Sequence, residues 1–167
     1  MATDEATIRG WFTGRIPEGW FAGPPAVELD REEITVIGTL PALPVGEGLS
    51  EVERRAAAEG YVERFREETR GRRIEIAREA EYRFRRKVSW GVRTEAGTVM
   101  FTTLSVPVMT RLRQPERRVL DTLVAAGVAR SRSDALAWCV RLVGKHADSW
   151  LAELREALQQ VDRVRAA

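Results

Sequence analysis

The segment from Val106 to His146 constrains the fold of this chain more than any other part of the sequence. It begins with an alternation in which less polar side chains are separated by Met109, Arg111 and Arg113, and this pattern predicts a short strand with one basic face. Pro115 stops the strand and suits the first turn of a following helix. A short strand of this kind is not stable without a partner strand.

The rest of the segment predicts two helices joined by a turn. Gly127 ends the first helix, and Ser131 or Ser133 caps the second, because a serine hydroxyl can accept from the free N–H groups of a first turn. One strand and two short helices cannot bury a core alone, so the strand needs a second copy of itself beside it. A two-fold dimer supplies that copy and forms an antiparallel two-stranded ribbon.

This order of elements resembles the ribbon–helix–helix DNA-binding family, the Arc- and MetJ-type repressors. The pieces that carry the resemblance are TRLRQPERRVLDTL, the turn AAGVAR and the helix start SRSDAL, within residues 106–146 or roughly a quarter of the chain. The resemblance implies an intertwined dimer that binds double-stranded DNA. Repression by occupying a promoter is the usual mode of the family.

The ribbon and the start of the second helix are the candidate DNA-binding site. A two-stranded ribbon fits the major groove, and the alternation directs Met109, Arg111 and Arg113 toward the base edges, where arginine can bond guanine O6 and N7 together. The resemblance implies that the N-terminus of the second helix binds a backbone phosphate through its N–H groups and positive dipole end. A solvated ribbon face and a plain helix cap are the alternatives. The candidate phosphate-binding residues are Arg130, Ser131, Arg132 and Ser133.

The distribution of charge adds a second basic segment. The net charge of the 167 residues is only +2, but residues 1–60 carry 11 acidic and 5 basic side chains, whereas residues 61–93 carry 11 basic and 6 acidic ones. Such a division favours a nucleic-acid surface. A solvated charged face is the alternative. The candidate secondary nucleic-acid contacts are Arg83, Arg85, Arg86 and Lys87.

We expect an α+β fold with two parts, an N-terminal extension over residues 1–104 and a ribbon–helix–helix domain with an extra C-terminal helix over residues 105–167. In the extension, AVELD and EEITVIGTL predict one β-hairpin, and SWGVRT and TVMFTTL predict another. Between them, Ser50 and Glu53 form a capping box at the start of a long Arg-rich helix, which we expect to kink or split near Gly71.

An approximate repeat, GWFTG and GWFAG, lies near the start of the chain. Its four large rings either cover an otherwise thin core, which we favour, or form a patch that binds a protein partner, since aromatic residues dominate interface hot spots. These rings belong to Trp11, Phe12, Trp20 and Phe21.

Composition and motifs exclude several classes of protein. A hydrophobic content of 44% and a charged content of 31% predict a folded, soluble chain, and neither a membrane-spanning run nor a signal peptide is recognisable. One cysteine and one histidine leave no Cys/His zinc site. Because a catalytic triad, a phosphate-binding glycine loop and paired carboxylates are also lacking, we expect no enzyme activity, catalytic residue, metal or cofactor.

These features together predict a transcriptional regulator that binds double-stranded DNA as a homodimer or a higher assembly of dimers. We expect it to be cytoplasmic and nucleoid-associated, with no membrane partner. The 25 arginines against two lysines are typical of a GC-rich bacterial genome. Two alternatives stay open. One is an antitoxin-like protein-interaction module with the same dimer fold, and the other is an RNA- or ribosome-associated factor that uses the Arg-rich helix.

Overall fold

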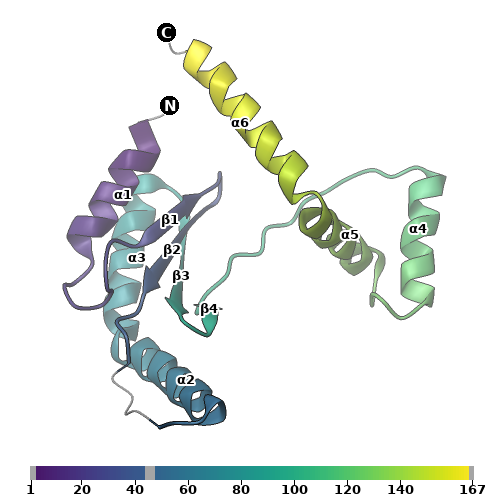
Figure 1. Cartoon of the computed structure of the whole chain (residues 1–167). Coiled ribbons are helices and arrows are strands. Elements are labelled where there is room, and N and C mark those ends of the chain that lie inside the picture. The colour runs from purple at the N-terminus through teal and green to yellow at the C-terminus, as the bar shows by residue number, and fades with distance from the viewer. Residues whose placement is uncertain (1–2, 44–47, 166–167) are drawn as a thin grey trace. The chain divides into compact units, whose positions relative to one another are not determined.

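A computed structural model describes residues 3–43 and 48–165, and Figure 1 shows its ribbon. The chain divides into two compact units, Met1–Pro107 and Val108–Ala167, which we describe separately. The described residues form six helices and one four-stranded sheet, so the expected α+β class is confirmed.

The N-terminal unit is built on a sheet with the strand order β1–β2–β3–β4. The strand bounds are Ala26–Leu29, Glu33–Thr39, Lys87–Thr94 and Gly97–Met100. β1 pairs antiparallel with β2, and β3 with β4, so both predicted hairpins are present. A parallel pairing of β2 with β3, from Glu33 opposite Lys87 to Thr39 opposite Arg93, joins the hairpins into one sheet. A parallel pair needs a long crossover connection, and the Arg-rich helical segment provides it.

The Arg-rich segment forms two helices, α2 (Glu51–Glu68) and α3 (Arg70–Phe84). The predicted capping box is present, because the Ser50 hydroxyl accepts from the Glu53 N–H at 3.3 Å and the Glu53 carboxylate accepts from the Ser50 N–H at 2.8 Å. The predicted break lies at Thr69, two residues before the glycine that suggested it.

A buried arginine closes the junction between α2 and α3. Arg73 donates from Nε to the Thr69 hydroxyl at 3.0 Å and from Nη2 to the Arg66 carbonyl at 2.8 Å. Its guanidinium lies 4.7 Å from the centroid of the Phe101 ring, so the residue that follows β4 packs against the junction. Burial, together with the nearby charges of Arg66 and Arg70, lowers the pKa of Arg73.

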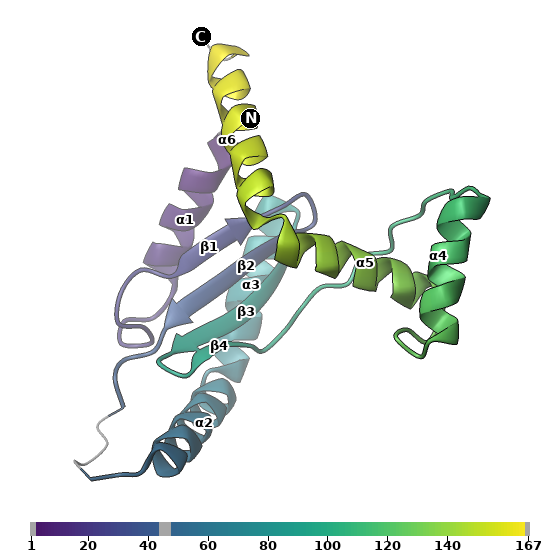
Figure 2. The ribbon, with the colours of Figure 1, turned by 45° about the vertical axis from the view of Figure 1, so that its right-hand side comes forward.

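Helix α1 (Thr3–Arg15), which contains the first motif of the repeat, is an element that the sequence did not predict. Ile8 and Phe12 on α1 are fully buried against α3 and the sheet, and the two helices lie on one face of the sheet (Figures 1 and 2). Arg15 of α1 donates from Nε and Nη2 to the Glu79 carboxylate of α3 at 2.7 and 2.6 Å. Burial of the apolar face therefore outweighs the low helix propensity of the two glycines in α1.

The rings of the repeat pack on the core of the N-terminal unit, as the favoured interpretation predicts: Phe12 is buried, and Trp11, Trp20 and Phe21 are partly buried against it. Phe12 is 0% exposed and cannot contact a partner, and Trp11 packs beside it. Trp20 and Phe21 pack around Phe65 of α2, with ring centroids 5.8 Å apart in both pairs.

The C-terminal unit consists of three helices, α4 (Gln114–Ala125), α5 (Arg132–His146) and α6 (Asp148–Arg165). Pro115 lies in the first turn of α4, and Gly127 has a φ of 72°, which suits glycine in the turn that follows the helix. The buried core of this unit is small and contains only Leu120, Ala129 and Ala135 among the described residues.

The predicted strand at residues 108–113 is not formed in the single chain. The whole segment between β4 and α4 is irregular in the described structure, and it ends in an extended residue, Arg113, with φ −80° and ψ 174° (Figure 2). A strand is defined by its hydrogen-bonded neighbour, so one chain alone cannot show the ribbon.

Candidate nucleic-acid interface

The predicted base-reading side chains lie on the segment before α4, residues 108–113. Met109 is 96% exposed, and Arg111 and Arg113 are also exposed. Neither arginine side chain makes a hydrogen bond or ion pair with another residue of the described chain. Leu112, between them, is half-buried against the Leu120 cluster. Val108 and Thr110, on the predicted less polar face, are exposed as well, so Leu112 alone of that face is covered in the single chain.

The end of this segment is fixed to α4 by two hydrogen bonds. The Arg117 backbone N–H donates to the Arg113 carbonyl at 3.1 Å, and Arg117 Nη1 donates to the Leu112 carbonyl at 2.7 Å. These bonds hold the backbone of the last two segment residues while the Arg113 side chain stays exposed.

The N-terminus of α5 is capped by Ser131, one of the two serines predicted for this role. Its hydroxyl accepts from the Asp134 N–H at 3.1 Å, and the Asp134 carboxylate accepts from the Arg130 N–H at 3.0 Å. The N–H groups of Arg132 and Ser133 belong to the first turn, so they have no acceptor within the helix. Two donors at the positive end of the helix are thus available to an anion.

Arg132 differs from the expectation that it binds phosphate. Its guanidinium donates from Nε and Nη2 to the two carboxylate oxygens of Asp121 on α4, at 2.7 and 2.8 Å. These hydrogen bonds lower the pKa of Asp121 and raise the pKa of Arg132. In this chain Arg132 therefore joins α4 to α5, and Arg130 is the candidate cation without a side-chain partner among the described residues.

The C-terminal unit also exposes apolar side chains that its own core does not cover. Val108 is 87% exposed and Val140 on α5 is 65% exposed. Large apolar side chains are exposed on all three helices, namely Val119, Val140, Leu142, Val143, Trp150, Leu154, Leu158 and Val161. So much apolar surface on a small unit is typical of a surface that binds another protein chain.

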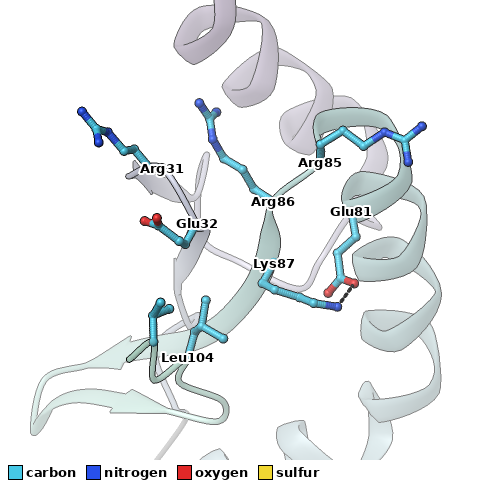
Figure 3. A pocket seen from close by; sticks show the side chains of 8 residues that line it. Arg31, Glu32, Glu81, Arg85, Arg86, Lys87 and Leu104 are labelled. Carbon is cyan, nitrogen blue, oxygen red and sulfur yellow. Dashed lines mark hydrogen bonds and ion pairs between the residues drawn. The ribbon is translucent and has the colours of Figure 1, made fainter. Parts of the chain in front are cut away.

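The second basic segment lies where α3 ends and β3 begins, and the structure brings three of its four residues to one pocket. Arg85, Arg86 and Lys87 line a pocket of about 490 Å³ (Figure 3). Arg83 does not line it, and its guanidinium lies 5.6 Å from the centroid of the Phe84 ring.

Sequence reasoning missed Arg31, which lines the same pocket from the turn between β1 and β2. Arg31 and Lys87 are far apart in the sequence and meet because the Lys87 N–H donates to the Glu32 carbonyl at 2.8 Å, at the start of the parallel pairing. No local sequence signal specifies that pairing.

Within residues 3–43 and 48–165, no group of three or more histidine, cysteine, aspartate or glutamate side chains could hold a metal ion. None of the described helices is both long and apolar enough to span a membrane.

Comparison with known proteins gives two family matches, one in each unit. The family described as "Rv1265-like protein, N-terminal domain" matches residues 6–100, and the family described as "Mb1296 C-terminal domain" matches residues 113–165. Three curated relatives are each 61% identical over 163 residues, which is 98% of this chain and 70% of the relative. They are the uncharacterized proteins Rv1265 and MT1303 of Mycobacterium tuberculosis strains and Mb1296 of Mycobacterium bovis. No solved structure matches the chain. By these matches, the chain belongs to the Rv1265-like protein family.

Proposed function

We propose that this chain is a sequence-specific double-stranded DNA-binding protein that acts as a homodimer and regulates transcription. The observation that carries the proposal is the exposed segment at residues 108–113, whose Arg111 and Arg113 side chains have no internal partner in the described chain. Arg15 and Arg132, by contrast, are held by carboxylates of their own chain.

The second copy of the chain supplies what the segment lacks. The unpaired backbone N–H and C=O groups of a strand-length segment can pair with another strand. Two segments related by a two-fold axis form an antiparallel ribbon, and their helices can then cover the exposed valines at positions 119, 140 and 143. A two-fold dimer would thus supply the missing partner strand and also cover the exposed apolar surface.

The ribbon offers a chemistry suited to the major groove. Met109, Arg111 and Arg113 from both copies line one face of it, and a bidentate arginine–guanine contact gives about 1–3 kcal/mol of discrimination against the wrong base. At the start of α5, the N–H groups of Arg132 and Ser133, with the Arg130 side chain nearby, suit a backbone phosphate.

The double variant Arg111→Ala/Arg113→Ala tests the reading of bases. A preferred sequence is first selected from a random duplex library with the unmodified protein, and affinities for that duplex and a scrambled duplex are then compared at one salt concentration. We expect the variant to remain a dimer by sedimentation and to lose most of its preference, at least tenfold for two bidentate contacts. The control is Arg118→Ala, which removes an exposed arginine of α4 and should keep the preference.

Two results would overturn the proposal. One is that the unmodified protein enriches no sequence, and the other is that the double variant discriminates as well as the unmodified protein. Competition with duplex RNA of the same sequence separates a DNA-binding protein from an RNA-binding one. The affinity should fall steeply with added salt, because phosphate contacts release counterions.

A further inference from the structure

The pocket at the junction of α3 and β3 has the size of a small-ligand site and a mostly charged lining. Its volume of about 490 Å³ lies within the range of small-molecule pockets. Four cationic and two anionic side chains surround it, and two apolar ones complete the lining. These are Arg31, Glu32, Glu81, Arg85, Arg86, Lys87, Leu104 and Val106.

The backbone around the pocket is held in place before any ligand arrives. The Asp30 carboxylate accepts from the Glu32 and Glu33 N–H groups at 2.8 and 2.6 Å, which fixes the turn that carries Arg31. On the other side, the Leu104 N–H donates to the Glu33 carboxylate at 3.1 Å. A ligand would therefore meet a preorganised frame, which reduces the entropy lost on binding.

The charges in the pocket favour an anion. Glu81 already accepts from Lys87 Nζ at 2.8 Å, so one of the two carboxylates is neutralised within the lining. In Figure 3, Arg31 and Arg86 extend in the same direction beside Glu32, whereas Leu104 lies at the opposite end of the pocket. The lining thus offers two guanidinium groups at one end and the apolar Leu104 side chain at the other.

Arg85, which lines the pocket, has an unusual backbone conformation. Its φ of 58° is the one positive value among the described non-glycine residues, in a conformation that disfavours a side chain. It ends α3 and turns the chain so that three consecutive basic residues line the pocket. Such strained residues cluster at functional sites.

We propose that this pocket binds a phosphate group, carried either by a small phosphate ester with an apolar part or by a nucleic-acid backbone. Guanidinium groups bind phosphate through paired N–H donors, and Leu104 and Val106 offer contact to an apolar substituent. The site belongs to the N-terminal unit and does not depend on the ribbon.

Calorimetric titration of the full chain with phenyl phosphate and, separately, with a short duplex DNA tests the proposal. Arg31→Ala removes one cation of the pocket and should weaken binding about tenfold, the effect of one charge-assisted hydrogen bond. Glu32→Gln removes the neighbouring negative charge and should strengthen binding severalfold. Both residues are exposed in a turn, so neither change should disturb the fold. Arg78→Ala, an exposed arginine of α3 outside the pocket, is the charge-matched control and should change nothing.

If Arg31→Ala weakens the binding of phenyl phosphate and Glu32→Gln strengthens it, the ligand is a small phosphate ester. The same opposite effects on the duplex, with phenyl phosphate unbound, identify the nucleic-acid backbone instead. The proposal is wrong if neither probe binds, or if the Arg31 and Glu32 variants bind both probes like the control. The variants that test the ribbon keep this pocket intact, so the two proposals can fail independently.

Discussion

Gly38 on β2 shows how closely single residues are packed in the N-terminal unit. A Cβ built at Gly38 would lie 2.2 Å from atoms of the Phe21 ring, far inside van der Waals contact. The second GWF motif can therefore pack over the sheet only because the strand has no side chain at this position. The glycine is required by the close approach of the ring, since its own φ is not positive.

Gly38→Ala should accordingly lower the free energy of unfolding by about 2 kcal/mol, because the ring must shift within a packed cluster. Gly60→Ala is the matched comparison, since Gly60 lies inside α2 and, apart from the adjacent backbone of the helix itself, no atom lies within 4 Å of the built Cβ. There alanine should raise the free energy of unfolding by about 1 kcal/mol through helix propensity. Urea denaturation followed by circular dichroism measures both. Similar midpoints for the two variants would contradict the packing of Phe21 on Gly38.

Between elements, the pair of Asp121 and Arg132 decides how α4 and α5 meet and what the start of α5 offers to DNA. Asp121 holds the Arg132 guanidinium in two hydrogen bonds, and Asp134 adds a second carboxylate in the first turn of α5. The positive charge at this end of the helix is therefore partly balanced within the chain.

Asp121→Asn should release Arg132 and tighten DNA binding. The released guanidinium can add a phosphate contact, so the slope of log affinity against log salt should steepen by about one counterion. Binding measured at several salt concentrations gives that slope, and Glu116→Gln, an exposed change on the same helix, serves as the control. An unchanged slope would show that Arg132 does not contact phosphate even when it is released.

The same pair makes stability depend on pH. Since the pKa of Asp121 is lower in the folded chain than its ordinary value, the ion pair stabilises the fold above the ordinary carboxyl range. That contribution is lost as the pH falls through the lowered pKa. The difference in unfolding midpoint between the unmodified protein and Asp121→Asn should thus be largest near neutral pH and shrink in acid. A difference that grows in acid would contradict this assignment.

For the whole molecule, self-association is the property on which the proposed function depends. Val140→Lys changes a side chain that is 65% exposed in the single chain, so it removes little packing within one copy. Sedimentation equilibrium should show a mass near twice 18.8 kDa for the unmodified protein. If α5 lies in the dimer interface, the mass of the variant should shift toward that of a single chain. Val52→Lys, at a position 78% exposed on α2, should leave the mass unchanged. An unmodified protein with the mass of one chain would remove the basis of the ribbon.

The sequence by itself determined the elements whose bounds depend on residues close together in the chain. Alternation gave both hairpins, the spacing of Ser50 and Glu53 gave the start of α2, and Pro115 and Gly127 gave the bounds of α4. At the candidate site, the same patterns gave an exposed Arg111 and Arg113 and a serine cap for α5. In each case the residues that decide the outcome lie within a few positions of one another.

Only the tertiary structure decided the features that depend on distant residues. Helix α1 forms despite two glycines because Ile8 and Phe12 are buried against α3 and the sheet. The parallel pairing of β2 with β3 brings Arg31 to a pocket with residues more than fifty positions away. The Arg132 guanidinium can donate to the Asp121 carboxylate only when α4 and α5 are packed together. Contacts of this kind arise from burial and charge summed over the folded chain, and no window of sequence contains them.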